Sequence, residues 1–136
     1  MTASFIVSRL SLARRQLQSA RNNMTQNDVE TAANRAFLAA ENAAAAAIAK
    51  SGERVAPVHG QIRARFEDLC DQGLIPQKFK GLLAQSYRFR LRGDYGRGIH
   101  RGKSIPHLTP TAMRETIYSV VELIDIVTRM PRKRRT

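Results

Sequence analysis

The chain has 136 residues, of which 43% are hydrophobic and 25% charged, and this is the size and composition of one globular domain. Aromatic residues are only 6% and Trp is absent, so a core of Ala, Leu, Ile and Val is expected, which favours helices over a β-sandwich. The longest run of small residues, 42–49, is too short to cross a bilayer, so no membrane association is expected. The lone Cys70 cannot form an internal disulfide and predicts a buried structural thiol in a cytoplasmic protein.

Basic residues outnumber acidic ones 23 to 11, and the excess lies in two segments. Eight bases and one acid, Asp94, lie between Lys78 and Lys103, and four consecutive bases follow Pro131. Most of these bases are Arg, whose guanidinium suits phosphate contacts, so the charge predicts RNA or another polyanion as partner. A solvated basic face without a partner is the alternative. The residues expected to bind nucleic acid are Arg88, Arg92, Arg97, Arg101, Lys103, Arg132, Lys133, Arg134 and Arg135.

Two long helices are expected in the first fifty residues. Apolar side chains recur at alternating intervals of four and three from Ile6 to Met24, which predicts a helix over 5–23. Asn27 is followed three residues later by Glu30, a pair that predicts the cap of a second helix running to about Lys50. The apolar face of this second helix is mostly Ala, so a neighbouring helix can approach it closely.

Two shorter helices are expected next. After a loop over 53–59, the third helix has an apolar stripe at positions i, i+4 and i+7 and ends near Gly73. Pro76 is expected in the first turn of the fourth helix, which continues to Gly93. The stripe of the third helix is Ile62, Phe66 and Leu69, and the apolar positions of the fourth are Phe79, Leu82, Leu83 and Tyr87.

The last part of the chain predicts a loop followed by one more helix. Segment 93–106 holds four Gly among basic residues, which predicts a long flexible loop. Thr109 before Pro110 predicts the start of a fifth helix. The fold expected is all-α: a single up-and-down helical bundle of about five helices over 1–130, followed by a basic disordered tail over 131–136. The first, second and last helices should supply most of its core.

Common nucleotide-binding and hydrolase motifs are absent from the sequence. Glu67, Asp68 and Asp71 share one short helix, but no His accompanies them at ligand spacing, so they are interpreted as a solvated face. Neither a metal site nor a cofactor is therefore predicted.

The end of the expected fourth helix combines charged and aromatic residues in a compact pattern. Arg90 and Asp94 are four residues apart, so they can pair on one helical face and orient the guanidinium. Tyr95 can pack inward with its hydroxyl near the pair. A purely structural pair that stabilises the helix end explains the same residues, and a site at which Arg90 contacts phosphate is the functional interpretation.

This Arg-x-x-x-Asp-Tyr pattern, the Ala-rich segment 34–43 and His59 opening a helix that contains Phe66 together resemble the HEPN domain, over roughly residues 5–130. The resemblance implies a helical bundle that forms a homodimer. It also implies a prokaryotic toxin–antitoxin or defence system, in which a nucleotidyltransferase-like antitoxin is the partner. Active HEPN domains have an Arg-x(4 to 6)-His motif that cuts RNA without metal, so the resemblance implies a metal-independent ribonuclease.

The spacing of this motif differs in the present chain. His100 follows Arg90 with nine residues between them, and it follows Arg92 with seven. Gly96 and Gly98 could let His100 fold back toward Arg90. Arg54 and His59 have the family's literal spacing, but they lie in the loop after the second helix, and we interpret that match as coincidence.

Two functional hypotheses follow. In the first, a HEPN-like ribonuclease uses His100 as general acid or base on RNA, while Arg90 or Arg92 stabilises charge on the phosphate and Asp94 and Tyr95 complete the site. Activity should then depend on an imidazole that titrates at about pH 6 to 7. In the second, a non-catalytic HEPN-like module binds RNA, a nucleotide or an antitoxin. A helical scaffold or DNA-binding bundle is a third class, for which the sequence offers no helix-turn-helix spacing.

Overall fold

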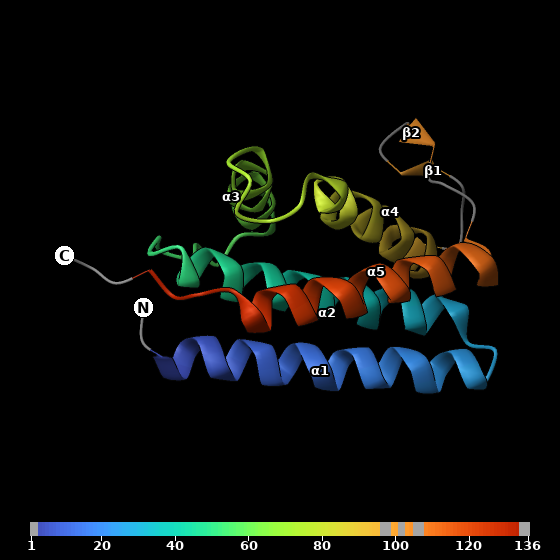
Figure 1. The fold of residues 1–136 in the computed structure, drawn as a ribbon. Helices are drawn as coiled ribbons and strands as arrows, with labels where there is room; N and C mark the ends of the chain where they lie inside the picture. Colours follow the sequence, from blue (N-terminus) through green and yellow to red (C-terminus); the bar gives the residue numbers. More distant parts are fainter. Residues whose placement is uncertain (1–2, 96–98, 101–102, 105–107, 134–136) are drawn as a thin grey trace.

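The computed structural model describes residues 3–95, 99–100, 103–104 and 108–133, with backbone only for 93–95, 99–100 and 103–104. Five α-helices carry the fold, and α1, α2 and α5 run side by side in Figure 1, with α3 and α4 on the side of α2 and α5 away from α1. The prediction of an all-α helical bundle is confirmed. The elements are α1 (Ala3–Thr25), α2 (Val29–Lys50), α3 (His59–Asp71), the 3-10 turn η1 (Gln77–Phe79), α4 (Leu82–Tyr95), β1 (Ile99–His100), β2 (Lys103–Ser104) and α5 (Pro110–Arg129).

Helix α2 is the centre of the bundle because it packs against α1, α3, α4 and α5. Its side chains are small, and its alanines are buried on every face from Ala32 to Ala49. Small side chains let helix axes approach closely, and a helix that is apolar all round is stable only when it is covered. The apolar stripes of α1 and α5 close the core, and the expectation that these three helices supply most of it is confirmed.

The N-terminal caps of α2 and α5 show how local sequence signals determine where the helices begin. The cap of α2 is Asp28 and not Asn27: the Asp28 carboxylate accepts a hydrogen bond from the Thr31 amide at 3.2 Å. Asn27 has a φ of 58°, a left-handed conformation that Asn tolerates in a turn. At α5, the Thr109 hydroxyl accepts from the Ala112 amide at 3.0 Å, so the Thr-Pro start signal is confirmed.

The connection between α3 and α5 differs from the sequence prediction in two details. Pro76 precedes a single 3-10 turn, and α4 itself begins only at Leu82, so the fourth helix is shorter at its start than expected. It is longer at its end, because Gly93 lies inside α4. Within the segment expected to be wholly irregular, β1 and β2 form a two-stranded antiparallel pair, with His100 opposite Lys103.

A buried lysine closes the end of the bundle where α2 and α5 finish. The Lys50 Nζ atom donates to the carbonyl oxygens of Val127 at 2.7 Å, Thr128 at 3.0 Å and Met130 at 2.8 Å. These carbonyls lie in the last turn and at the C-cap of α5, where few amides remain to satisfy them; of the three, Val127 also accepts from the Met130 amide at 3.2 Å. The amide of Lys133 in turn donates to the Lys50 carbonyl at 2.7 Å, so the chain is held against α2 beyond the end of α5.

Replacing Lys50 tests this contact. Burial lowers the pKa of the Lys50 ammonium and the Arg14 charge lowers it further, yet three carbonyls require the charged donor. We expect Lys50→Met to lower the free energy of unfolding by about 2 kcal/mol, since one buried and two partly buried carbonyls lose their charged donor. Urea unfolding followed by circular dichroism measures the change. Lys78→Met is the control, because Lys78 is exposed in an ion pair with Glu122; equal losses in both variants would contradict the assignment.

Candidate functional site

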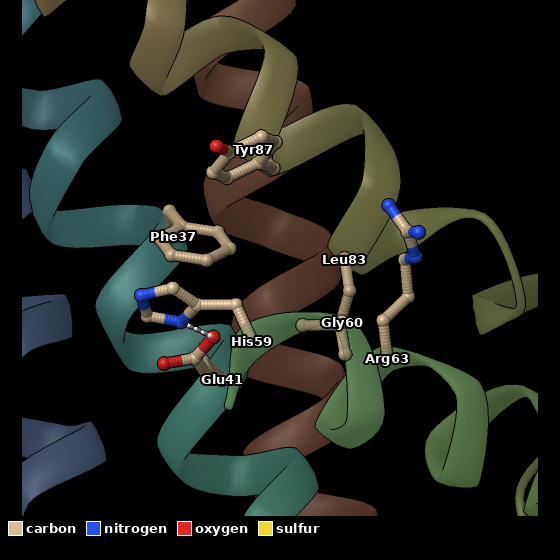
Figure 2. Close-up of a pocket in the computed structure, with 7 residues that line it drawn as sticks. All are labelled: Phe37, Glu41, His59, Gly60, Arg63, Leu83 and Tyr87. Atoms are coloured by element: carbon tan, nitrogen blue, oxygen red, sulfur yellow. Dashed lines mark hydrogen bonds and ion pairs between the residues drawn. The ribbon is translucent and has the colours of Figure 1, made fainter. Parts of the chain in front are cut away.

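Two polar side chains meet where α3 crosses α2. His59 is the first residue of α3, and its Nδ1 atom forms a hydrogen bond and ion pair with Glu41 Oε2 of α2 (Figure 2). The Glu41 side chain is 15% exposed, whereas the His59 side chain is 57% exposed. A carboxylate on a central, largely buried helix thus orients an imidazole that solvent and ligands can reach.

The ring of Phe37, one turn before Glu41 on α2, organises the groups around this pair. The His59 ring lies edge-on to it with centroids 5.7 Å apart, and the Tyr87 ring of α4 lies at 5.5 Å (Figure 2). The Arg90 guanidinium lies over the same ring, with its Cζ atom 5.3 Å from the centroid. A cation over an aromatic face is held by the ring quadrupole, so Phe37 positions Arg90 beside the imidazole.

Two adjoining hollows share His59 and Glu41 as lining residues. The first has a volume of about 220 Å³ and is closed by Gly60 and Arg63 of α3 and by α4. The second, about 240 Å³, extends toward α1 and includes Arg9, whose Nη1 atom donates to Asn42 Oδ1 at 3.0 Å. Among the described residues Glu41 is the only acid that lines either hollow, and one arginine lines each of them, Arg63 of α3 the first and Arg9 of α1 the second.

The predicted site residues are only partly described. Arg88 is exposed on α4, and Arg90 and Arg92 are half-buried. The backbones of Asp94 and Tyr95 belong to the last turn of α4, and that of His100 belongs to β1, but the side chains of all three lie outside the described part. The structure therefore places Arg90 and His59 against the same Phe37 ring, and it leaves the predicted grouping of Arg90, Asp94, Tyr95 and His100 as a prediction.

The remaining predicted RNA contacts fall at two places. Lys103 is in β2, described by its backbone, and Arg132 and Lys133 are exposed after α5. Helix α5 separates these places by about 30 Å, at 1.5 Å per residue. Arg97, Arg101, Arg134 and Arg135 lie outside the described residues.

Two bases of the segment 78–103 have acidic partners. Lys78 Nζ lies 2.7 Å from Glu122 Oε2, and Lys80 Nζ lies 2.8 Å from Asp71 Oδ1. The hydrogen bond from Lys80 is the main cause that lowers the pKa of Asp71, and the same contact raises the pKa of Lys80. These two lysines therefore link the α3–α4 connection to its neighbours, and the charge available to a polyanion is smaller than the residue count suggests.

His59 is the site residue that sequence reasoning left out of its candidates. The sequence predicts His59 only as the first residue of a helix. Its partner Glu41 is 18 residues away, and no local pattern connects the two. Arg54, which has the family spacing to His59, is not among the residues that line either hollow. The signal that could have found the site is Glu41 itself, the only ionisable residue in segment 36–49 of α2, since a carboxylate on a largely buried helix needs a partner.

The described residues thus define an all-α bundle with a cationic hollow that contains a histidine. Residues 7–130 match the family model of the HEPN domain, so the chain belongs to the HEPN domain family. A search of curated proteins finds no significant match. Within the described ranges, no helix is long and apolar enough to span a membrane, and no three His, Cys, Asp or Glu residues gather as metal ligands would.

Cys70 is a buried residue of α3 and lines neither hollow. Burial, followed by the charges of Asp71 and Glu67, raises the pKa of its thiol from 9.0 to about 11. The thiol is therefore protonated at neutral pH, and a protonated thiol is a poor nucleophile. This agrees with a structural role for the side chain.

Thiol labelling tests the state of Cys70. At about pH 8, a rise of the thiol pKa by this amount lowers the thiolate fraction on the order of 100-fold, and burial slows access further. We expect dithionitrobenzoate to modify the native protein at least that much more slowly than the protein in urea. Modification of the native protein at the rate of free glutathione would show that the thiol is accessible.

Proposed function

We propose that this HEPN domain acts on RNA and cuts it without a metal ion. The observation that carries the proposal is that Arg63 and Arg9 line the two adjoining hollows that share His59 and Glu41, while Arg90 lies over the Phe37 ring that borders the first hollow. Phosphodiesters require cationic contacts, and their cleavage by transesterification requires proton transfer by a group such as imidazole. Family membership supports the same assignment, since active HEPN domains are metal-independent ribonucleases.

The cationic groups are of the kind that binds RNA strands. Arg90 and Arg9 each contact an aromatic ring, and Arg9 also binds an amide oxygen, so these contacts hold the guanidinium groups in place. Arg63 and Arg88 are exposed on the neighbouring helices α3 and α4. A single RNA strand that crosses α3 and α4 can place successive phosphates on these side chains.

The biological setting is proposed from family membership. The domain acts as the toxin of a prokaryotic toxin–antitoxin or defence system, in the cytoplasm, as a homodimer with a nucleotidyltransferase-like antitoxin. A second candidate function is a HEPN module that binds RNA or its antitoxin and does not cleave RNA. It is favoured by the nine residues between Arg90 and His100, which exceed the four to six of the family motif.

Cleavage and binding measured side by side test the proposal. The purified protein is incubated with a mixed RNA pool in EDTA, and binding of a labelled RNA is recorded against salt. Wild type should cleave the RNA, and its affinity should fall steeply with salt. Arg90→Ala should lose cleavage and reduce the salt slope by about one, because one phosphate contact disappears.

Arg21→Ala is the matched control, because Arg21 is exposed on α1, about 18 Å along the helix from Arg9. It should leave cleavage unchanged. Binding without cleavage would move the assignment to the non-catalytic module. Absence of binding at low salt would contradict an RNA-directed function.

A further inference from the structure

The proposed reaction needs an imidazole near arginine side chains, and the structure offers His59, which lies before Arg90 in the sequence and is not the His100 of the stretched motif. His59 and the Arg90 guanidinium lie 5.7 and 5.3 Å from the centre of the same Phe37 ring. They are 31 positions apart in the sequence and are brought together by the packing of α3 and α4 on α2.

We propose that the phosphodiester of RNA binds at the hollow between α2, α3 and α4, and that His59, oriented by Glu41, performs the proton transfer there. The inference rests on the proposed function and names its acid–base residue. Glu41 is a positioning residue, because it touches the imidazole and not the RNA. Arg63 and Arg90 are the phosphate-binding cations.

The hydrogen bond to Glu41 determines which imidazole nitrogen is available. Nδ1 faces the Glu41 carboxylate and donates its proton to it, so the neutral ring carries its lone pair on Nε2. Nε2 has no hydrogen-bond partner among the described residues, and the side chain is more than half exposed. The edge contact with Phe37 restricts rotation of the ring. The imidazole is therefore held in one tautomer and one orientation, as a general base requires.

The charge around His59 suits a polyanion. The ionisable groups that face it are Glu41 of α2, Arg63 of its own helix, Tyr87 and Arg90 of α4, and Arg9 of α1 across the second hollow. Among the described lining residues, Arg63 and Arg9 against the single carboxylate of Glu41 leave the two hollows together net positive. In Figure 2 the Arg63 side chain rises from α3 toward α4, on the far side of Gly60 from the imidazole.

The step balances without a cofactor. Neutral His59 Nε2 takes the proton of the ribose 2′-hydroxyl, and the 2′-oxygen forms a bond to phosphorus. The bond from phosphorus to the 5′-oxygen of the next nucleotide breaks, and that oxygen takes a proton from water. The products are a 2′,3′-cyclic phosphate and a 5′-hydroxyl end, and the imidazolium returns its proton to solvent. The guanidinium groups stabilise the additional negative charge on the phosphoryl oxygens in the transition state.

A substitution at Gly60 can obstruct the hollow while His59, Glu41 and Arg63 are retained. A Cβ atom built on Gly60 meets no heavy atom within 4 Å, so a larger side chain fits the fold and projects into open space. Because Gly60 lines the hollow, Gly60→Leu should obstruct it. Gly81 also has no heavy atom within 4 Å of a built Cβ but lines neither hollow, so Gly81→Leu is the matched control.

The first test is a binding measurement that does not depend on turnover. The imidazole ¹⁵N resonances of the three histidines, His59, His100 and His107, are recorded while a 2′-O-methyl RNA hexamer is added, an RNA that cannot undergo transesterification. We expect saturable shifts of the His59 resonances, because the phosphodiester binds against this imidazole. Gly60→Leu should weaken binding about tenfold, a loss of about 1.4 kcal/mol, and Gly81→Leu should not.

The second test is the pH profile of RNA cleavage in EDTA. His59→Gln should lower the rate by about 100-fold or more, the usual contribution of a general base. Glu41→Gln keeps a hydrogen-bonding group but removes the charge, so it should shift the acidic limb of the profile while binding of the 2′-O-methyl hexamer stays near the wild-type value. If Glu41 has a purely structural role, Glu41→Gln should change the stability of the protein but not the position of the acidic limb of the pH profile.

The outcomes separate this inference from the proposed function. If the hexamer binds while the His59 resonances do not respond, or if cleavage depends on His100 and survives in His59→Gln, the assignment of His59 is wrong and the RNA-directed function stands. If the hexamer and natural RNA do not bind at low salt, both proposals are wrong. If His59 responds and cleavage is lost in His59→Gln alone, the assignment holds.

Discussion

The close approach of four helices to one alanine-rich helix is the constraint on which the rest of the structure depends. The buried alanines of α2 leave room for α1 and α5 along its length and for α3 and α4 across it. Large side chains at these positions would separate the helices and overpack the core. Because the neighbours lie so near, the few larger α2 side chains reach them directly, as Phe37 reaches α3 and α4 and Lys50 reaches the end of α5. The site and the helix-end contact are thus both results of the same packing.

The sequence predicts the helices well because the signals for them are local. The apolar stripes and the Thr109–Pro110 start signal depend on residues a few positions apart, and the structure confirms them. The errors are also local: Asn27 and Asp28 are both good caps, and the backbone conformation decides between them. The Pro76 segment becomes a 3-10 turn, since one proline start signal does not determine whether an α-helix follows. The site could not be predicted in this way, because Glu41, His59 and Arg90 meet only through tertiary packing.

Which basic side chains are available to a ligand also depends on tertiary packing and could not be predicted from the sequence. The two basic segments are evident in the sequence, but which bases are available to a ligand depends on their neighbours. Lys78 and Lys80 are paired with acids of other elements, whereas Arg9 lies far from both segments in sequence and lines a hollow beside the imidazole. The match to the HEPN family model covers the whole bundle. The difference from the family at Arg90 is limited to the spacing of one motif. His59 and Arg90 contact the same Phe37 ring, so the proposed site does not depend on the spacing between Arg90 and His100.

The central claim is that RNA contacts the face formed by α2, α3 and α4. Photocrosslinking of a 4-thiouridine RNA to the wild-type protein, followed by mass spectrometry of the adducts, measures this directly and requires no cleavage. The account predicts adducts on peptides that contain Phe37, His59 and Tyr87, because these rings surround the hollow. Adducts confined to the basic tail after Pro131, or to the part of α1 remote from Arg9, would contradict it.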